Sequence, residues 1–185
     1  MNPEQTIHNF YNSPKDKKRE IGKYHASELW AIYKGYTTTG NFFTGKSVDK
    51  QGQAMMFRGS AFEDMYAKVL TAQKVKFKQQ ERLEIEIAKD IFISGKTDFS
   101  FKDFIIETKC PNKETSGIPD KWTMQCELYY RASKKQVYLG IFHKDGEDII
   151  KFYKYAPSNE LWETMQKTII DFHNRLKKRY DTTKR

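Results

Sequence analysis

Three charged residues that could bind a metal ion and assist hydrolysis lie close together in the sequence. Asp98 is followed nine residues later by Glu107 and then, two positions beyond, by Lys109. Glu107 and Lys109 would share one face of a strand, because side chains alternate along it. Burying a bare charge is costly, so charges within an apolar segment such as FIIETK must be paired or bind a metal. The simpler alternative is a salt bridge, which an isolated pattern of this kind also fits.

Two further segments carry polar side chains that could join these charges. Glu63 lies in a segment with the apolar periodicity of an amphipathic helix. Gln125 and Tyr129 are four residues apart and would share one face of a helix directly after the FIIETK strand. Each has a structural alternative: a solvated carboxylate for Glu63, and packing at a helix–sheet contact for the other two.

In this order and spacing, the sequence resembles the PD-(D/E)XK nuclease superfamily, especially its RecB-like and lambda-exonuclease-like branch with a QxxxY motif. The matching segments are RGSAFED, SGKTDF, IIETKC and QCELY, over roughly residues 55 to 142. The resemblance implies an α/β protein with a restriction-endonuclease-like core, in which helices flank a central mixed β-sheet. The catalytic residues that it implies are Asp98, Glu107, Lys109, Gln125 and Tyr129.

The resemblance also implies that carboxylates hold a divalent cation. Mg²⁺ prefers oxygen ligands and keeps several waters, so Asp98, Glu107 and the Thr108 carbonyl would suit it together with a substrate phosphate. Mn²⁺ should substitute. Glu63 would add a ligand, directly or through water, and the number of ions stays open.

The remaining motif residues would act on water and substrate. Lys109 would lie next to the attacking water, favouring hydroxide and offsetting charge that develops in the transition state. Gln125 would orient a catalytic group or the substrate, and Tyr129 would stack on a base or bond a phosphate.

An excess of basic residues points to a polyanionic partner. The chain has 33 Lys+Arg against 24 Asp+Glu, a net charge of +9, and such an excess attracts nucleic acid by releasing condensed counterions. With the resemblance, we expect DNA as the partner, and recombination or repair proteins as further candidates. Basic residues that flank the motifs are candidate substrate contacts, although each also fits a solvated face: Arg58, Lys96, Lys113 and Arg131.

Several protein classes are not expected. The two cysteines, Cys110 and Cys126, cannot supply the four ligands usually needed for a closed zinc site or an iron–sulfur cluster, so we expect no iron–sulfur cluster. No apolar run approaches the ~20 residues that cross a membrane. The first residues do not resemble a secretory signal, which indicates a cytoplasmic or other intracellular protein.

The elements around the motifs are expected in β, α, β order. Residues 1–20 are polar and lysine-rich and should form a flexible arm, followed by a single nuclease domain over 21–185. Ser27 should cap a short helix that ends at Gly35, and a loop should follow from Thr37 to Gln53. The further expected elements are a helix over 54–71, strands over 82–88 and 91–101, a hairpin over 91–109 that turns near Lys102, a helix over 121–132 capped by Asp120, strands over 137–142 and 149–155 joined by HKDGED, and a long helix introduced by Pro157 and Ser158.

These features favour a metal-dependent nuclease that hydrolyses DNA phosphodiester bonds, expected to be an exonuclease in recombination, repair or phage DNA processing. The first alternative is a structure- or sequence-specific endonuclease, because the same metal centre serves both. The second is a DNA-binding protein that keeps a nuclease fold without turnover. Polarity, strand preference and oligomeric state stay open.

Overall fold

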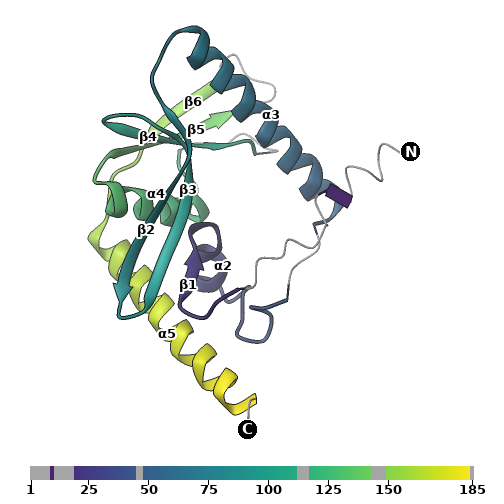
Figure 1. The fold of residues 1–185 in the computed structure, drawn as a ribbon, viewed down its shortest axis with the longest axis vertical. Helices are drawn as coiled ribbons and strands as arrows, with labels where there is room; N and C mark the ends of the chain where they lie inside the picture. Colours follow the sequence, from purple (N-terminus) through teal and green to yellow (C-terminus); the bar gives the residue numbers. More distant parts are fainter. Residues whose placement is uncertain (1–8, 11–18, 45–47, 112–116, 143–148, 184–185) are drawn as a thin grey trace.

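A computed structural model of the chain describes residues 9–10, 19–44, 48–111, 117–142 and 149–183. Its centre is a six-stranded mixed β-sheet with helices on both faces (Figure 1). The expected α/β class is therefore confirmed. Most of the predicted arm and the whole HKDGED turn lie outside the described residues. The elements are β1 (Lys23–His25), η1 (Ala26–Glu28), α2 (Leu29–Tyr33), α3 (Lys50–Ala72), β2 (Lys78–Ala88), β3 (Ile91–Ser100), β4 (Phe104–Lys109), α4 (Asp120–Ser133), β5 (Gln136–Phe142), β6 (Ile150–Lys154) and α5 (Asn159–Thr183).

Strand β3 is the hub of the sheet. It pairs in parallel with β1 and antiparallel with β2 and β4. Strands β4 and β5 are parallel, with α4 as the crossover between them, and β6 is antiparallel to β5. The expected hairpin of β3 and β4 and the expected β, α, β unit are confirmed.

The two faces of the sheet are covered by different helices. Alternate residues of a strand point to opposite faces, and β4 and β5 separate accordingly. Ile105, Val137, Leu139 and Ile141 belong to the larger core, with residues of α2, α4 and α5. Ile106 and Tyr138 belong to a smaller core, with Leu70 and Tyr66 of α3. Strand β4 therefore has α3 on one face and α4 on the other.

Three expectations about helix starts are wrong. Helix α3 begins four residues earlier than expected because the Asp49 side chain caps it, accepting a hydrogen bond from the Gly52 amide at 2.7 Å. Ser27 lies inside the short η1 turn and caps no α-helix. Asp120 is the first residue of α4, after Pro119, and makes no capping bond. Ser158 does cap α5, because its Oγ accepts from the Leu161 amide at 3.2 Å.

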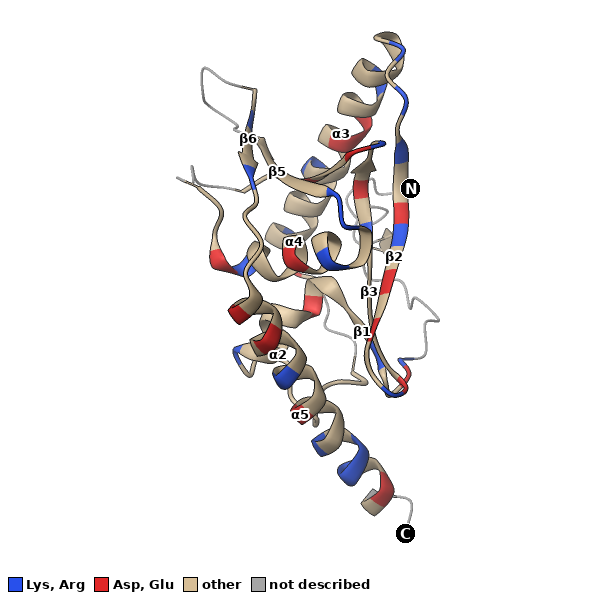
Figure 2. Ribbon diagram, turned by 90° about the vertical axis from the view of Figure 1, so that its left-hand side faces the viewer, with Lys and Arg blue, Asp and Glu red and all other residues tan. Residues whose placement is uncertain are grey.

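Strand β2 carries charges of both signs along its length (Figure 2). Lys78 pairs with Glu81 at 2.7 Å and Arg82 with Glu84 at 2.8 Å, both at the surface. Charged residues on an outer strand discourage pairing with another chain. No helix in the described part of the chain is long and apolar enough to cross a membrane.

Candidate active site

The predicted catalytic residues meet where β3 and β4 separate. The paired residues of these strands end at Phe99 and Ile106. Beyond that point Asp98 takes the place of a main-chain acceptor: its Oδ2 accepts hydrogen bonds from the Thr108 amide at 2.7 Å and the Thr108 hydroxyl at 2.6 Å. The Asp98 carboxylate is thereby fixed against the strand that carries Glu107 and Lys109.

Glu107 is buried, and only one of its two carboxylate oxygens has a hydrogen-bond partner among the described residues. Its side chain pairs through Oε1 with Lys109, as expected for two residues on one face of β4. The residue is only 2% exposed, and its Oε2 is a buried oxygen without a hydrogen-bond partner among the described residues. A buried oxygen without a partner raises the free energy of the folded protein. A proton or a cation bound to Oε2 would remove this cost.

Burial and repulsion from neighbouring carboxylates shift two glutamates of the cluster, Glu63 and Glu107, toward their protonated forms. Burial raises the pKa of Glu107 to about 8; Asp98 and Glu63 add to this rise and Lys109 opposes it. Burial and repulsion from Asp98 raise the pKa of Glu63 to about 7, with Lys109 opposing. These influences place Glu63, on α3, beside the cluster.

Lys109 remains positively charged in this environment. Burial alone would lower the pKa of its ammonium group, but attraction to Glu107 and Asp98 outweighs burial and raises it. The cluster therefore combines two glutamates whose pKa values are raised with a lysine that keeps its proton. A bound cation or an approaching phosphate would strongly change the protonation of these groups.

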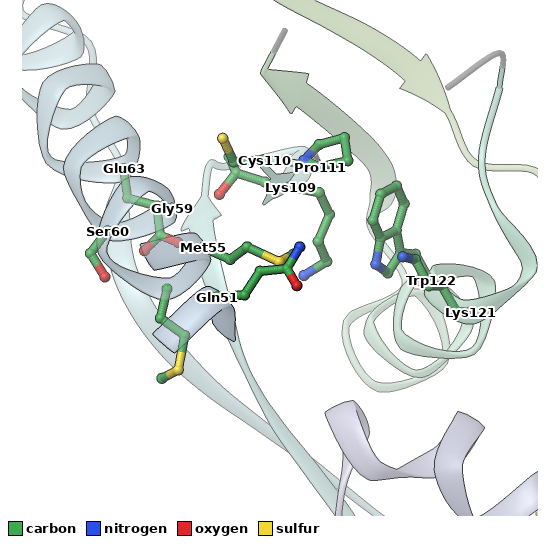
Figure 3. A pocket seen from close by; sticks show the side chains of 12 residues that line it. Gln51, Met55, Gly59, Ser60, Glu63, Lys109, Cys110, Pro111, Lys121 and Trp122 are labelled. Carbon is green, nitrogen blue, oxygen red and sulfur yellow. The ribbon is translucent and has the colours of Figure 1, made fainter. Parts of the chain in front are cut away.

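The cluster opens into a cavity of about 730 Å³ between α3, the end of β4 and the start of α4. Figure 3 shows Lys109 reaching into it between Gln51 and Met55 on one side and Trp122 on the other. The lining residues are Gln51, Met55, Met56, Gly59, Ser60, Glu63, Thr108, Lys109, Cys110, Pro111, Lys121 and Trp122. The volume lies within the range of sites that hold small ligands.

Gln125 and Tyr129 lie behind the cluster and anchor it. The Tyr129 hydroxyl donates to the Lys96 main-chain carbonyl at 2.7 Å, and the Gln125 side-chain amide donates to the same hydroxyl at 2.8 Å. The Tyr129 ring is fully buried, so it offers no face to a base in this structure. Burial and the nearby Glu107 raise its pKa, which keeps the phenol protonated as a donor.

Gly95 makes room for this anchor. A Cβ at position 95 would lie 2.8 Å from Tyr129 Cε1 and 2.9 Å from the Ala26 Cβ. Gly95→Ala is expected to lower the free energy of unfolding by about 1–3 kcal/mol through overpacking, measured by chemical denaturation. Gly59→Ala is the matched control. A Cβ at position 59, in helix α3, would meet nothing within 4 Å. The free energy of unfolding of Gly59→Ala should therefore rise by about 0.5–1 kcal/mol. Equal stability of the two variants would contradict the packing argument.

The predicted phosphate contacts do not all reach the site. Arg58 is close enough to Cys110, on the cavity wall, to influence its pKa. Lys96 is exposed on β3 two residues before Asp98. Arg131 lies elsewhere: it pairs with buried Glu127 at 2.7 Å and bonds Asn159 at 2.8 Å, between α4 and α5. Lys113 is outside the described residues.

Some cavity residues were not identified from the sequence. Ser60 precedes Glu63 by about one helical turn, a spacing that could have indicated it. Trp122 packs against the core in part and also lines the cavity. The sequence predicts a loop at Gln51, but Gln51 lies in the first turn of α3.

Asp98 and Glu107 are the residues of the cluster that could bind a metal ion. In the described part of the chain, no three His, Cys, Asp or Glu side chains are placed to hold a metal by themselves. Mg²⁺ keeps several waters and is usually bound by one or two carboxylates with substrate phosphates. Asp98 and the bare Oε2 of Glu107 fit that pattern.

Solved structures share this fold over most of the chain. The alkaline exonuclease LHK-Exo from Laribacter hongkongensis matches with a TM-score of 0.66 and 13% identity, over 97% of this chain and 96% of that one. The same exonuclease in complex with dAMP gives 0.64 and 15%, over 89% and 92%. A phage-related exonuclease from Haemophilus somnus 129PT gives 0.59 and 15%, over 87% and 96%.

No family model and no curated protein matches the sequence. At such low identity, the similarity to the solved structures concerns the fold. The chain has the fold of these exonuclease structures, so the restriction-endonuclease-like core that the resemblance implied is confirmed.

Proposed function

We propose that this protein is a magnesium-dependent deoxyribonuclease that hydrolyses phosphodiester bonds. The observation that carries the proposal is the bare, buried Oε2 of Glu107, whose ion-pair partner Lys109 lines an open cavity. A salt bridge between Glu107 and Lys109 accounts only for the Oε1 atom and leaves the buried Oε2 atom without a partner. The fold shared with exonuclease structures supports the same reading of the cluster.

Asp98 and Glu107 would hold the ion, with the Thr108 carbonyl and Glu63 as further oxygen ligands. When bound, Mg²⁺ (or Mn²⁺) supplies Lewis-acid activation of the phosphate and of a water molecule. The Thr108 amide and hydroxyl orient Asp98 by donating to the same carboxylate oxygen, Oδ2, so that the Oδ1 atom takes no part in these two hydrogen bonds.

Lys109 would stabilise the negative charge that grows on the phosphate oxygens during attack. Its raised pKa favours this electrostatic role over that of a general base. Gln125 and Tyr129 would act as positioning residues, because they hold the Lys96 carbonyl and so the strand that leads to Asp98.

DNA as substrate and attack at strand ends belong to the same proposal. The net charge of +9 suits a polyanion. The matched structures are exonucleases, and one of them is a complex with dAMP. A role in recombination, repair or phage DNA processing would follow, with proteins of those processes as partners. A structure-specific endonuclease is the alternative use of the same centre.

The deciding experiment is digestion of end-labelled single- and double-stranded linear DNA, with closed circular DNA in parallel. We expect Mg²⁺-dependent release of mononucleotides or short products from linear DNA, abolished by a chelator. Cleavage of the closed circle would favour the endonuclease. DNA binding without any cleavage, in Mg²⁺ or Mn²⁺, would leave a DNA-binding protein on a nuclease fold.

Metal binding should also depend on pH. The folded-state pKa values of Glu63, about 7, and Glu107, about 8, lie above the ordinary 4.5. The metal-free folded protein therefore holds protons that the unfolded chain releases, and its stability should fall as pH rises from about 4.5 to 8. The cation binds only the deprotonated carboxylates. For each carboxylate that must lose a proton, the apparent affinity for the cation therefore falls up to about tenfold for every pH unit below the pKa of that carboxylate.

The Tm increase caused by Mg²⁺ should accordingly be larger at about pH 8.5 than at about pH 6. Thermal melts with Mg²⁺ or with chelator, at both pH values, measure this increase. Potassium chloride at matched ionic strength is the control for general salt effects. An equal increase at both pH values would contradict binding at Glu63 and Glu107.

A further inference from the structure

A second cavity, of about 440 Å³, lies where α2, α4 and α5 meet. Figure 1 shows α2 beside the other two helices, below the end of α4. The aromatic wall of this second cavity is formed by Trp30 and Tyr33, whose ring centroids are 5.8 Å apart. The other lining residues are Lys34, Asp120, Thr123, Met124, Tyr155, Ala156, Ser158, Glu160, Leu161 and Thr164.

The first turn of α4 is shared between the two cavities. Lys121 and Trp122 line the cavity of Lys109, whereas Asp120, Thr123 and Met124 line the second one. Successive helical residues are rotated by about 100°, so these two groups lie on opposite sides of α4. A strand would therefore pass over the N-terminal end of α4, at Asp120, to reach the second cavity from the first.

Each cavity carries a lysine over an indole ring. Lys121 Nζ lies 4.6 Å from the centroid of Trp122, and Lys34 Nζ lies 4.6 Å from Trp30 and 5.1 Å from Tyr33. Aromatic rings with nearby cations are the elements that bind single-stranded nucleic acid, by stacking on bases and attracting the backbone. Lys34 is exposed, so it can move from the rings to a phosphate when a base takes its place.

The acidic residues of the second cavity indicate which part of a nucleotide enters it. Asp120 and Glu160 line it, and their charges would repel a phosphate. They can accept hydrogen bonds from the exocyclic amino group of a base, as carboxylates do with cytosine. The chemistry thus suits a neutral, amino-bearing base inside and the phosphate outside, near Lys34.

We propose that this second cavity binds one unpaired base of single-stranded DNA, adjacent to the strand segment held at Lys109. The link to cleavage rests on the proposed nuclease function; the binding itself does not. Bases of a duplex are paired and stacked, so the site selects single strands or single-stranded ends over blunt duplex. Cytosine should be preferred over thymine, which lacks the amino group.

The test is fluorescence anisotropy with short labelled oligodeoxycytidine in chelator, where nothing is cleaved. Tyr33→Ala and Lys34→Ala should each weaken binding, the former by at least about fivefold, as expected for loss of a stacking ring. Tyr33 is 44% exposed, so its replacement should leave the thermal melt unchanged. Tyr36→Ala is the matched control: Tyr36 is 64% exposed and lies outside the wall of this cavity.

Wild-type protein should bind oligodeoxycytidine at least about tenfold more tightly than oligothymidine, the low end of the range for one hydrogen bond to a charged group. Unchanged affinity in Tyr33→Ala and Lys34→Ala, or an equal loss in Tyr36→Ala, would overturn the proposal. A wild-type protein that fails to digest DNA but shows the Tyr33-dependent binding would refute the nuclease function alone. Digestion with Tyr33-independent binding would refute the second site alone.

Discussion

Lys109→Met is expected to reduce DNA cleavage by about 10³-fold, the scale of losing one preorganised charge at the transition state. Methionine keeps the unbranched stem that fills the space beside β4 but removes the ammonium group. Glu107 loses the partner that opposes its high pKa, so it should take up a proton more readily. The measurement is single-turnover cleavage of end-labelled DNA in saturating Mg²⁺.

The control for this variant is Lys102→Met, the same replacement in the exposed turn between β3 and β4. That variant should cleave like the wild type. Cleavage by Lys109→Met at the wild-type rate would show that the lysine serves only as a salt-bridge partner. Thermal melts of both variants separate a catalytic loss from unfolding.

Asp98→Asn should abolish both cleavage and the stabilisation by Mg²⁺. The amide oxygen can still accept the hydrogen bonds from Thr108, at 2.7 and 2.6 Å in the wild type, so the local structure is kept. The negative charge that would hold the ion is lost. We expect a fall in cleavage of about 10³-fold or more, because metal activation contributes several kcal/mol.

Asparagine is a sharper probe here than alanine. Asp98→Ala would leave a buried amide and a buried hydroxyl of Thr108 without an acceptor, at a cost of about 1–3 kcal/mol each. Asp103→Asn, in the exposed β3–β4 turn, is the matched control and should keep full activity. Persistence of the Mg²⁺-induced Tm increase in Asp98→Asn would rule out the metal site as proposed.

The sequence was most informative where function depends on local periodicity. Alternation along FIIETK placed Glu107 and Lys109 on one face, and the spacing of four placed Gln125 and Tyr129 together; the structure shows both contacts. Such relations need only the repeat of a strand or a helix. They hold before anything is known about how the elements pack.

Features that depend on contacts between distant segments could not be predicted. Strand β1 has three residues and exists through its pairing with β3, so it carries no periodicity of its own. Arg131 looked like a phosphate contact, but Glu127 and Asn159 engage it. The burial of Glu107 Oε2 likewise results from the packing of several elements around one residue. In each case the decisive neighbour lies far away in the chain or is set by tertiary packing.

The hydrogen bond from Tyr129 to the Lys96 carbonyl joins helix α4 to the strand that carries Asp98. Gly95 brings the two elements into close contact at the same point. The carboxylates and the cavity wall formed by α4 are therefore parts of one rigid unit, built on regular elements and not on loops. The free energy that arranges them is supplied once, when the chain folds, so the proposed reaction would require little reorganisation of the site.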